Sequence, residues 1–289
     1  EGLGNTIYPL TIHSNFHSGY LGLIGNYSQN SVTDSIRDLR LAKAKVTGTG
    51  FGQTAGVLIG RGDGAILNVQ VTGSVVVSGT HSAAGGLAGV NGGPITRTSA
   101  SVDGSVGATG FAGGLIGMNI GTQFGAGMLT ETYATGNVSG GDGAEVGGLI
   151  GDEIGATVSQ SYALGTVGGG TNSFVGGLFG VNEDGNDNPR ANQAYSVGAV
   201  STGSGGTVGG LIGQDAVDST ISDAYWDLDT SGVSDPAQGA GNVQNDPGIT
   251  GLSDAQLKSG LPAGFDPAIW GQSASINNGY PYLLANPPQ

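Results

Sequence analysis

Short apolar runs alternate with polar and glycine-rich stretches along most of this chain. The runs are four to six residues long and rich in Val, Ile and Leu, and Gly, Asn, Ser and Thr fill the stretches between them. Over residues 20–230, apolar residues never keep the three-and-four spacing of an amphipathic helix for ten residues. The pattern therefore predicts short β-strands joined by turns.

The predicted strands recur with a period of about 30 residues. A pentapeptide typified by Gly-Gly-Leu-Ile-Gly occurs seven times, and its successive final glycines are 28 to 35 residues apart. A second motif, such as QSYALGTV at 160–167, follows each copy and places four tyrosines at the same phase: Tyr133, Tyr162, Tyr195 and Tyr225. A unit this small cannot enclose its own core, so neighbouring units must stack. Because parallel crossovers are strongly right-handed, we predict an all-β, right-handed parallel β-helix (β-solenoid) of about seven coils.

Two adjacent apolar positions in the pentapeptide compete for the core. The first is leucine in all seven copies, and the second is isoleucine, alanine or phenylalanine. Either one row points outward, or the glycines bend the chain into a corner that turns both rows inward. We expect the corner, since tight bends require glycine. Two residues past the last glycine, polar residues predict a turn and a hydrogen-bonded ladder along the solenoid: Asn91, Asn119, Glu153, Asn182 and Asp215.

The repeat ends near Gly232. Beyond it, Ser253 and Gln256 fit a capping box for a short helix, and aromatic residues become frequent. We therefore predict a β-solenoid over residues 1–232 and a C-terminal cap over residues 233–289. The alternative for 233–289 is a linker to a following domain.

Charge and composition exclude several classes of partner. The chain has 289 residues, 60 glycines, no cysteine and a net charge of −14. Residues 1–141 carry six basic and six acidic side chains, whereas residues 142–289 carry two basic and sixteen acidic ones. Such a surface repels phosphate backbones and anionic lipid, so we expect no nucleic-acid partner. No apolar run approaches the 18 residues of a membrane span, so we expect no membrane insertion.

Acidic residues are the main candidates for chemistry. The segment NEDGNDNPR at 182–190 brings three carboxylates into one loop, and these form a candidate calcium site: Glu183, Asp184 and Asp187. The alternative is a solvated insertion that aids solubility. Two further carboxylate groups, Asp215 with Asp218 and Asp223, and Asp227 with Asp229, would suit glycoside hydrolysis if suitably spaced.

The histidines and an RGD tripeptide give weaker evidence of a functional site. The three histidines, His13, His17 and His81, are too scattered for a zinc site or a catalytic triad, and the zinc-peptidase motif HExxH does not occur. An RGD tripeptide at 61–63 follows the second pentapeptide. The alternatives are an exposed integrin-binding loop and ordinary turn residues, and we expect Arg61 and Asp63 to be turn residues. We predict no catalytic residue and no cofactor other than the candidate calcium ion.

The paired motifs, GGLIG with SYATGNVSG-like partners, resemble the GLUG repeat of bacterial surface proteins over roughly residues 20–230. That repeat is found in large secreted adhesins of the filamentous-haemagglutinin type and beside the catalytic domains of IgA-specific metallopeptidases. The resemblance implies a surface-exposed β-solenoid, and it does not imply a reaction.

We therefore expect a non-catalytic segment of a secreted adhesin at the bacterial cell surface. It would act as a rigid scaffold or bind a glycan or protein of a host or neighbouring cell, through rows of Thr, Ser, Asn and Tyr. We expect a monomer that is part of a longer chain. The alternatives are a polysaccharide hydrolase or lyase on the same solenoid, and a purely structural spacer.

Overall fold

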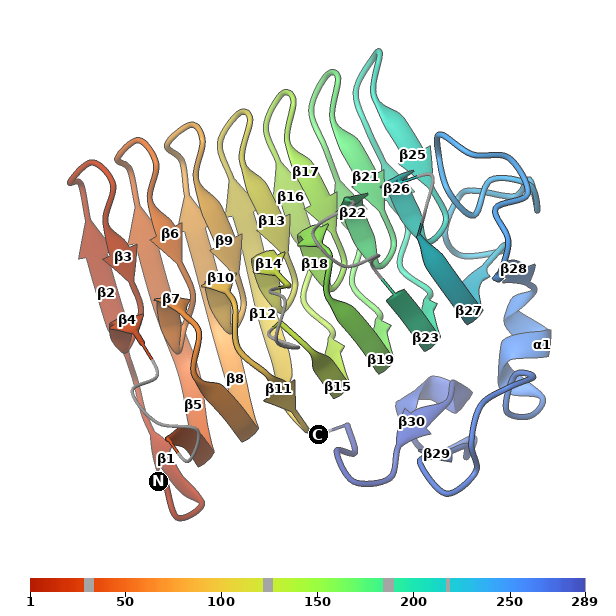
Figure 1. Cartoon of the computed structure of the whole chain (residues 1–289), viewed down its shortest axis with the longest axis horizontal. Helices are drawn as coiled ribbons and strands as arrows, with labels where there is room; N and C mark the ends of the chain where they lie inside the picture. Colours follow the sequence, from red (N-terminus) through yellow and green to blue (C-terminus); the bar gives the residue numbers. More distant parts are fainter. Residues whose placement is uncertain (29–33, 122–126, 184–189, 217–218, 289) are drawn as a thin grey trace.

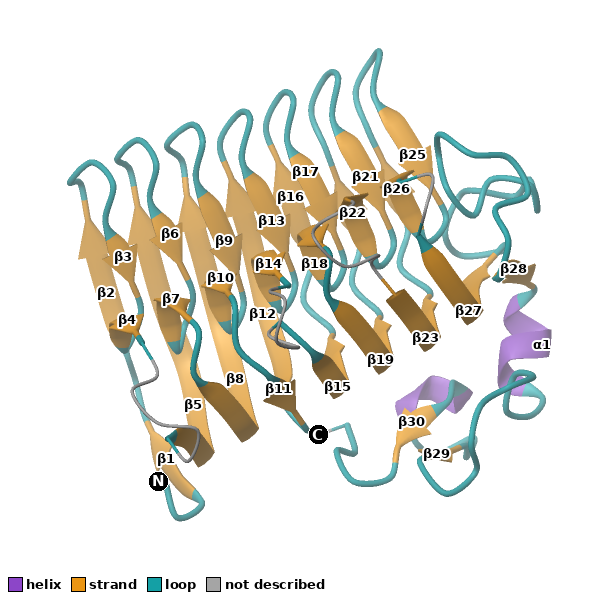
Figure 2. Ribbon diagram, viewed as in Figure 1, coloured by secondary structure: helices purple, strands orange, loops and turns teal. Residues whose placement is uncertain are grey.

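A computed structural model describes residues 1–28, 34–121, 127–183, 190–216 and 219–288 of the chain. Parallel strands stack side by side into a β-solenoid of about seven turns, as the repeat predicts (Figure 1). Among these residues, helix is confined to one short α-helix and one 3-10 turn, both in the C-terminal segment (Figure 2). The predicted fold class is confirmed.

Each turn contributes strands to three sheets. Sheet 1 contains β3 (Tyr20–Leu21), β6 (Thr54–Ala55), β9 (Ala83–Gly85), β13 (Phe111–Gly113), β17 (Glu145–Gly147), β21 (Phe174–Gly176) and β25 (Thr207–Gly209). Sheet 2 contains β4 (Ile24–Tyr27), β7 (Ile59–Gly62), β10 (Ala88–Asn91), β14 (Ile116–Ile120), β18 (Ile150–Ile154), β22 (Phe179–Glu183) and β26 (Ile212–Asp215). The chain passes from sheet 1 to sheet 2 within each pentapeptide.

Sheet 3 is larger because most turns cross it with two strands. Its first half is built on β1 (Asn5–Ile7), β2 (Thr11–Ser14), β5 (Ser35–Gly48), β8 (Ala65–Val77), β11 (Ile95–Thr96) and β12 (Ser99–Val106). Later turns add β15 (Leu129–Ala134), β16 (Val138–Gly140), β19 (Thr157–Ala163), β20 (Val167–Gly168), β23 (Arg190–Ser196), β24 (Val200–Ser201), β27 (Thr220–Asp227) and β28 (Ile249–Leu252). Two long strands, β5 and β8, cross sheet 3 in a single step, whereas the turns from β11 and β12 to β23 and β24 cross it with two shorter strands.

The pentapeptide is a corner, as expected from its glycines. From the second turn onward both apolar rows are buried, for example Leu149 and Ile150 at 0% exposure. The bend between sheets 1 and 2 leaves no room for a side chain, because a Cβ on Gly147 would lie 1.9 Å from the carbonyl oxygen of Ile150. In the first turn, Leu23 remains 37% exposed.

The predicted polar ladder runs inside the solenoid at the end of sheet 2, and all five side chains are buried. The amide nitrogen of Asn91 donates to Asn119 at 2.8 Å, and that of Asn119 donates to Glu153 at 2.7 Å. Further along, Asn182 donates to Asp215 at 2.5 Å. These bonds join successive turns and satisfy polar groups that would be costly to bury alone.

Two further ladders consist of residues with positive φ. One lies on sheet 3 at a polar position of seven consecutive turns: Asp38, Asn68, Arg97, Glu131, Gln160, Gln193 and Asp223. The other lies at the tip of the loop that precedes sheet 1: Ser18, Gly52, His81, Thr109, Gly143, Asn172 and Gly205. The left-handed conformation turns the chain at the same place in each coil, although most of these residues are not glycine.

The C-terminal segment has two parts. Residues 233–252 add to the last turn, since β28 pairs with β27 and Ala240 bridges Ile212. The helix α1 (Asp254–Lys258) follows with the predicted capping box of Ser253 and Gln256. Then come β29 (Trp270–Gly271), the 3-10 turn Asn277–Gly279 and β30 (Tyr282–Leu283), which pairs with β29.

Residues 253–288, here called the C-terminal strap, do not sit over the end of the solenoid. They return along its flank past β27, β23 and β19 (Figure 1), and Asn286 and Pro287 contact β15 through hydrogen bonds with Glu131 and Tyr133. The strap covers the four tyrosines of the second motif, which form a second apolar cluster with Leu257, Phe265, Trp270, Tyr280 and Leu283. Aromatic residues are concentrated in this segment because they pack against that row.

Candidate functional site

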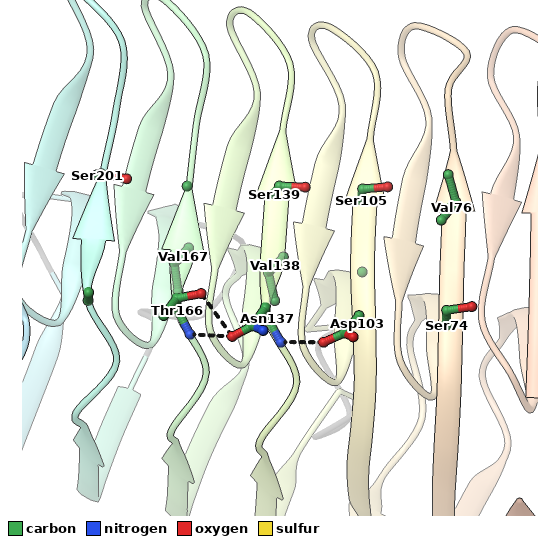
Figure 3. Close-up of a pocket in the computed structure, with 13 residues that line it drawn as sticks. Ser74, Val76, Asp103, Ser105, Asn137, Val138, Ser139, Thr166, Val167 and Ser201 are labelled. Carbon is green, nitrogen blue, oxygen red and sulfur yellow. Dashed lines mark hydrogen bonds between the residues drawn. The ribbon is translucent and has the colours of Figure 1, made fainter. Parts of the chain in front are cut away.

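An open groove of about 530 Å³ crosses five strands of sheet 3: β8, β12, β16, β20 and β24 (Figure 3). It lies on the outer surface of the solenoid, and its lining comes from the same phase of successive turns. Buried Val138 and Val167 point inward from these strands, so their sequence neighbours point out into the groove. The repeat therefore generates a row of similar side chains across the strands.

Two outward rows of mostly polar side chains line the groove, with Val76, Gly168 and Ala199 at the remaining positions. In the first row, Ser105 pairs in register with Ser139, and Ser201 follows after Gly168. Within the described part of the chain, the hydroxyls of these three serines form no hydrogen bond. They are free to donate to, or accept from, a ligand.

The second row is ordered by its own hydrogen bonds. Asp103 Oδ1 accepts the backbone N–H of Asn137 at 3.0 Å. Asn137 Oδ1 in turn accepts the backbone N–H of Thr166 at 3.1 Å and its hydroxyl at 2.8 Å (Figure 3). These bonds fix the side-chain positions while the Asn137 amide nitrogen stays available. Asp103 is the one charged residue among those that line the groove.

The candidate calcium ligands are only partly placed. Glu183 ends β22 and is exposed, whereas Asp184 and Asp187 lie outside the described residues. Among the residues that are described, no group of three His, Cys, Asp or Glu side chains could hold a metal ion. The calcium site remains a prediction.

The other carboxylates proposed for hydrolysis have structural surroundings. Asp215 is buried in the polar ladder, where it accepts hydrogen bonds from Asn182 and Ser219. Asp223 belongs to a positive-φ ladder on sheet 3, and Asp218 lies outside the described residues. Asp227 is buried at the end of β27 and accepts the backbone N–H groups of Asp229 and Thr230. Asp215 and Asp223 thus lie on different sheets.

Sequence reasoning missed the strongly raised pKa values of four carboxyl groups: Glu145, Asp152 and Glu153 on β17 and β18, and Asp246, whose pKa burial and Asp215 raise to about 7. Burial raises the pKa of Glu153 to about 8, against hydrogen bonds from Asn119 and the Ala156 N–H that favour its ionised form. Burial, with repulsion from Glu145 and other carboxylates, raises the pKa of Asp152 to about 9. Burial and Glu183 raise that of Glu145 to about 7. Asp152 Oδ1 and Glu145 Oε2 are buried without a hydrogen-bond partner. Glu153 was predicted as a member of the polar ladder, but nothing in the sequence indicated that these carboxyl groups would be buried.

The tyrosine row is not a binding surface in this structure, contrary to expectation. The rings of Tyr133 and Tyr162 stack with centroids 4.8 Å apart, and those of Tyr162 and Tyr195 at 5.1 Å. All four tyrosines are buried, and three of their hydroxyls donate to carbonyl oxygens of the strap. These tyrosines therefore attach the strap to the solenoid.

The RGD tripeptide and two of the histidines occupy ordinary positions in strands and loops. Arg61 and Gly62 belong to strand β7, so the expectation that Arg61 is a turn residue is wrong, and Asp63 follows the strand in an exposed position. His81 is one of the positive-φ residues at the loop tips. His13 lies on the exposed β2, where its ring contacts the Thr47 hydroxyl at 2.9 Å.

Comparison with known proteins supports the architecture. No protein-family model and no curated protein matches the chain. A crystal structure of a candidate immunoglobulin A1 protease from Bacteroides ovatus superposes with a TM-score of 0.53 at 16% identity, over 98% of this chain and 76% of that one. At this identity the similarity shows the fold alone. Among the described residues, no helix is both long and apolar enough to cross a membrane. The chain is thus a parallel β-solenoid similar to part of that bacterial protein.

Proposed function

We propose that this chain is a non-catalytic segment of a secreted bacterial cell-surface adhesin, in which the solenoid presents the groove on sheet 3 to an extended glycan or protein chain. The observation that carries the proposal is the pair of polar rows across five strands. A row of hydroxyls that lack internal partners suits a ligand that also extends along the solenoid axis. Few contacts per turn are available, so affinity arises from several turns acting together.

The composition of the groove favours binding over hydrolysis. Glycoside hydrolysis ordinarily uses two carboxyl groups on either side of the scissile bond, and Asp103 is the one carboxyl group in the lining. The lining also contains no Lys or Arg that could stabilise an acidic sugar during a lyase reaction. A ligand that is neutral or basic fits this surface better than an anionic one.

The adhesin context rests on the sequence. The GLUG-like repeat, the absence of cysteine and the acidic composition are what support secretion and a place at the cell surface. The protein from Bacteroides ovatus shares the fold with this chain, and its proposed protease activity belongs to that protein.

The experiment is retention of the labelled chain on an array of glycans and matrix proteins, with and without calcium, while released sugar is measured. Saturable retention without release supports the proposal. Release of sugar would instead support a hydrolase or lyase, and silence in both readouts would leave a structural spacer. Dependence of retention on calcium would support the predicted site at Glu183, Asp184 and Asp187.

A further inference from the structure

The C-terminal strap is attached to the solenoid by two kinds of contact. Along most of its length the contacts are neutral: the Tyr133 hydroxyl donates to the Pro287 carbonyl at 3.2 Å, and the Asn286 amide donates to the Glu131 carbonyl at 3.0 Å. Next to the last turn the contact is ionisable and joins Asp227 of β27, Asp254 of α1 and Tyr280. Protonation can therefore change attachment at this second site.

The single proton of Tyr280 is enough for only one full hydrogen bond to the two carboxyl groups. The Tyr280 hydroxyl lies 3.1 Å from Asp227 Oδ2 and also forms a hydrogen bond with Asp254 Oδ1. A phenol has one proton to donate, and ionised carboxylates only accept. Without a further proton the phenol can reach both oxygens only through a weaker bifurcated bond, so two full hydrogen bonds require a proton on one of the two carboxyl groups.

The surroundings assign that proton to Asp227. Lys258 Nζ lies 2.7 Å from Asp254 Oδ1, and this cation together with Tyr280 lowers the pKa of the partly exposed Asp254. Asp227 is 0% exposed and has no cationic partner among the described residues, and burial raises its pKa. The chain of donors then runs from Asp227 Oδ2 to the Tyr280 oxygen, and from the Tyr280 proton to Asp254.

We infer that the C-terminal strap is a proton-dependent latch, closed while Asp227 carries a proton and loosened when that proton is lost. Without it, a single phenolic proton separates two buried or half-buried carboxylates, and their repulsion weakens the end of the strap. Opening would uncover Trp270 and the tyrosine row beneath it.

The other charged groups at the cluster do not reverse this dependence. Asp229 Oδ2 accepts the Asp254 N–H at 2.9 Å, which adds negative charge on the solenoid side. Lys258 lies 4.3 Å above the Tyr280 ring and moves with the strap, since both residues belong to it. Because docking raises the pKa of Asp227, attachment is strongest below the free pKa of an Asp and weakens as pH rises through the docked pKa. The groups that chiefly lower the pKa of Asp254, Lys258 and Tyr280, belong to the strap itself, so they act whether or not the strap is docked.

The test is acrylamide quenching of tryptophan fluorescence in the full chain between about pH 4.5 and pH 9. Both tryptophans are buried, but Trp226 belongs to the solenoid core and only Trp270 to the strap. The opening equilibrium changes by up to about tenfold per pH unit between the free and docked pKa values of Asp227, so quenching should rise with pH and then level off.

Asp227→Asn is the decisive variant. Its Oδ1 can still accept from Asp229 and Thr230, and its Nδ2 donates to Tyr280 as the protonated acid does. Quenching should stay low and flat with pH. Asp235→Asn, an exposed change in the same C-terminal segment, should respond like the wild type. Tyr280→Phe should be quenched readily even at pH 5. A wild type that does not respond to pH, or an Asp227→Asn protein that still does, would overturn the inference.

Discussion

The side-chain amide of Asn119 donates a 2.7 Å hydrogen bond to the carboxyl group of Glu153 in the next turn, and both side chains are buried. Asn119 also accepts from Asn91 at 2.8 Å and donates to the Gly127 carbonyl at 2.8 Å. One side chain thus links three turns and also binds the Gly127 carbonyl. The polar ladder is therefore part of the core.

Replacing Asn119 by alanine should cost roughly 2–4 kcal/mol, because it leaves buried groups of Asn91, Glu153 and Gly127 without partners. Urea unfolding followed by circular dichroism measures the loss. Asn137→Ala is the matched control, since Asn137 occupies an exposed row and should cost only about 0.5–1 kcal/mol. Equal losses at the two positions would show that the ladder does not stabilise the core.

Stability should fall as pH rises from about 5 to 9. The folded pKa values of Glu145, Asp152 and Glu153 are about 7, 9 and 8, above the values near 4 of unfolded chains. The folded state therefore holds protons that the unfolded state has lost, and each group destabilises by up to about 1.4 kcal/mol per pH unit until its folded pKa is passed. Denaturant midpoints at pH 5, 7 and 9 measure the trend.

Asp152→Asn separates this effect from general charge repulsion. The amide imitates the protonated acid, so the variant should differ least from the wild type at pH 5 and be much more stable than it at pH 9. A constant difference between the two proteins across this range would contradict the assigned burial of Asp152.

The positive-φ ladder at the loop tips predicts that a substitution by glycine can increase the stability of the folded state. Thr109 is β-branched and has a φ of 52°, a conformation that Gly143 and Gly205 adopt in equivalent positions. Thr109→Gly should remove about 1–2 kcal/mol of backbone strain from the folded state. The greater conformational freedom of glycine in the unfolded chain should offset about 0.5–1 kcal/mol of that gain in stability. Thr109→Ala keeps the Cβ and should gain nothing. Melting temperatures of the two variants decide the point, and a gain in both or in neither would contradict it.

The repeat made the solenoid predictable because similar side chains must stack in every turn. The corner at Leu149 and Ile150 and the ladder through Asn119 could be anticipated for the same reason. The positive-φ position at Gln160 could not, because the corresponding residues share polarity but are not glycine, so propensity gives no signal there.

The strap was harder to predict because it does not repeat. The phase of Tyr162 was visible in the sequence, but a regular tyrosine row is compatible with an exposed surface as well as a covered one. Its cover comes from residues such as Trp270, about 100 positions further along the chain. Long-range packing of this kind depends on where the non-repeating chain turns back, which local patterns do not specify. The groove, in contrast, is built from the repeats. Its serines could be recognised in the sequence as polar positions, but the strand register was needed to show that Ser105 lies beside Ser139.

The most direct test of the central claim compares three proteins on the same glycan and matrix-protein array: the wild type, Ser139→Tyr and Thr220→Tyr. Ser139 lies in the middle of the groove, whereas Thr220 is an exposed strand residue of sheet 3 outside it. If the groove binds the ligand, the tyrosine at 139 fills it and should reduce retention at least tenfold, a change of about 1.4 kcal/mol. The Thr220→Tyr protein should be retained like the wild type. Unchanged retention of the Ser139→Tyr protein would contradict the assignment of this groove as the binding surface.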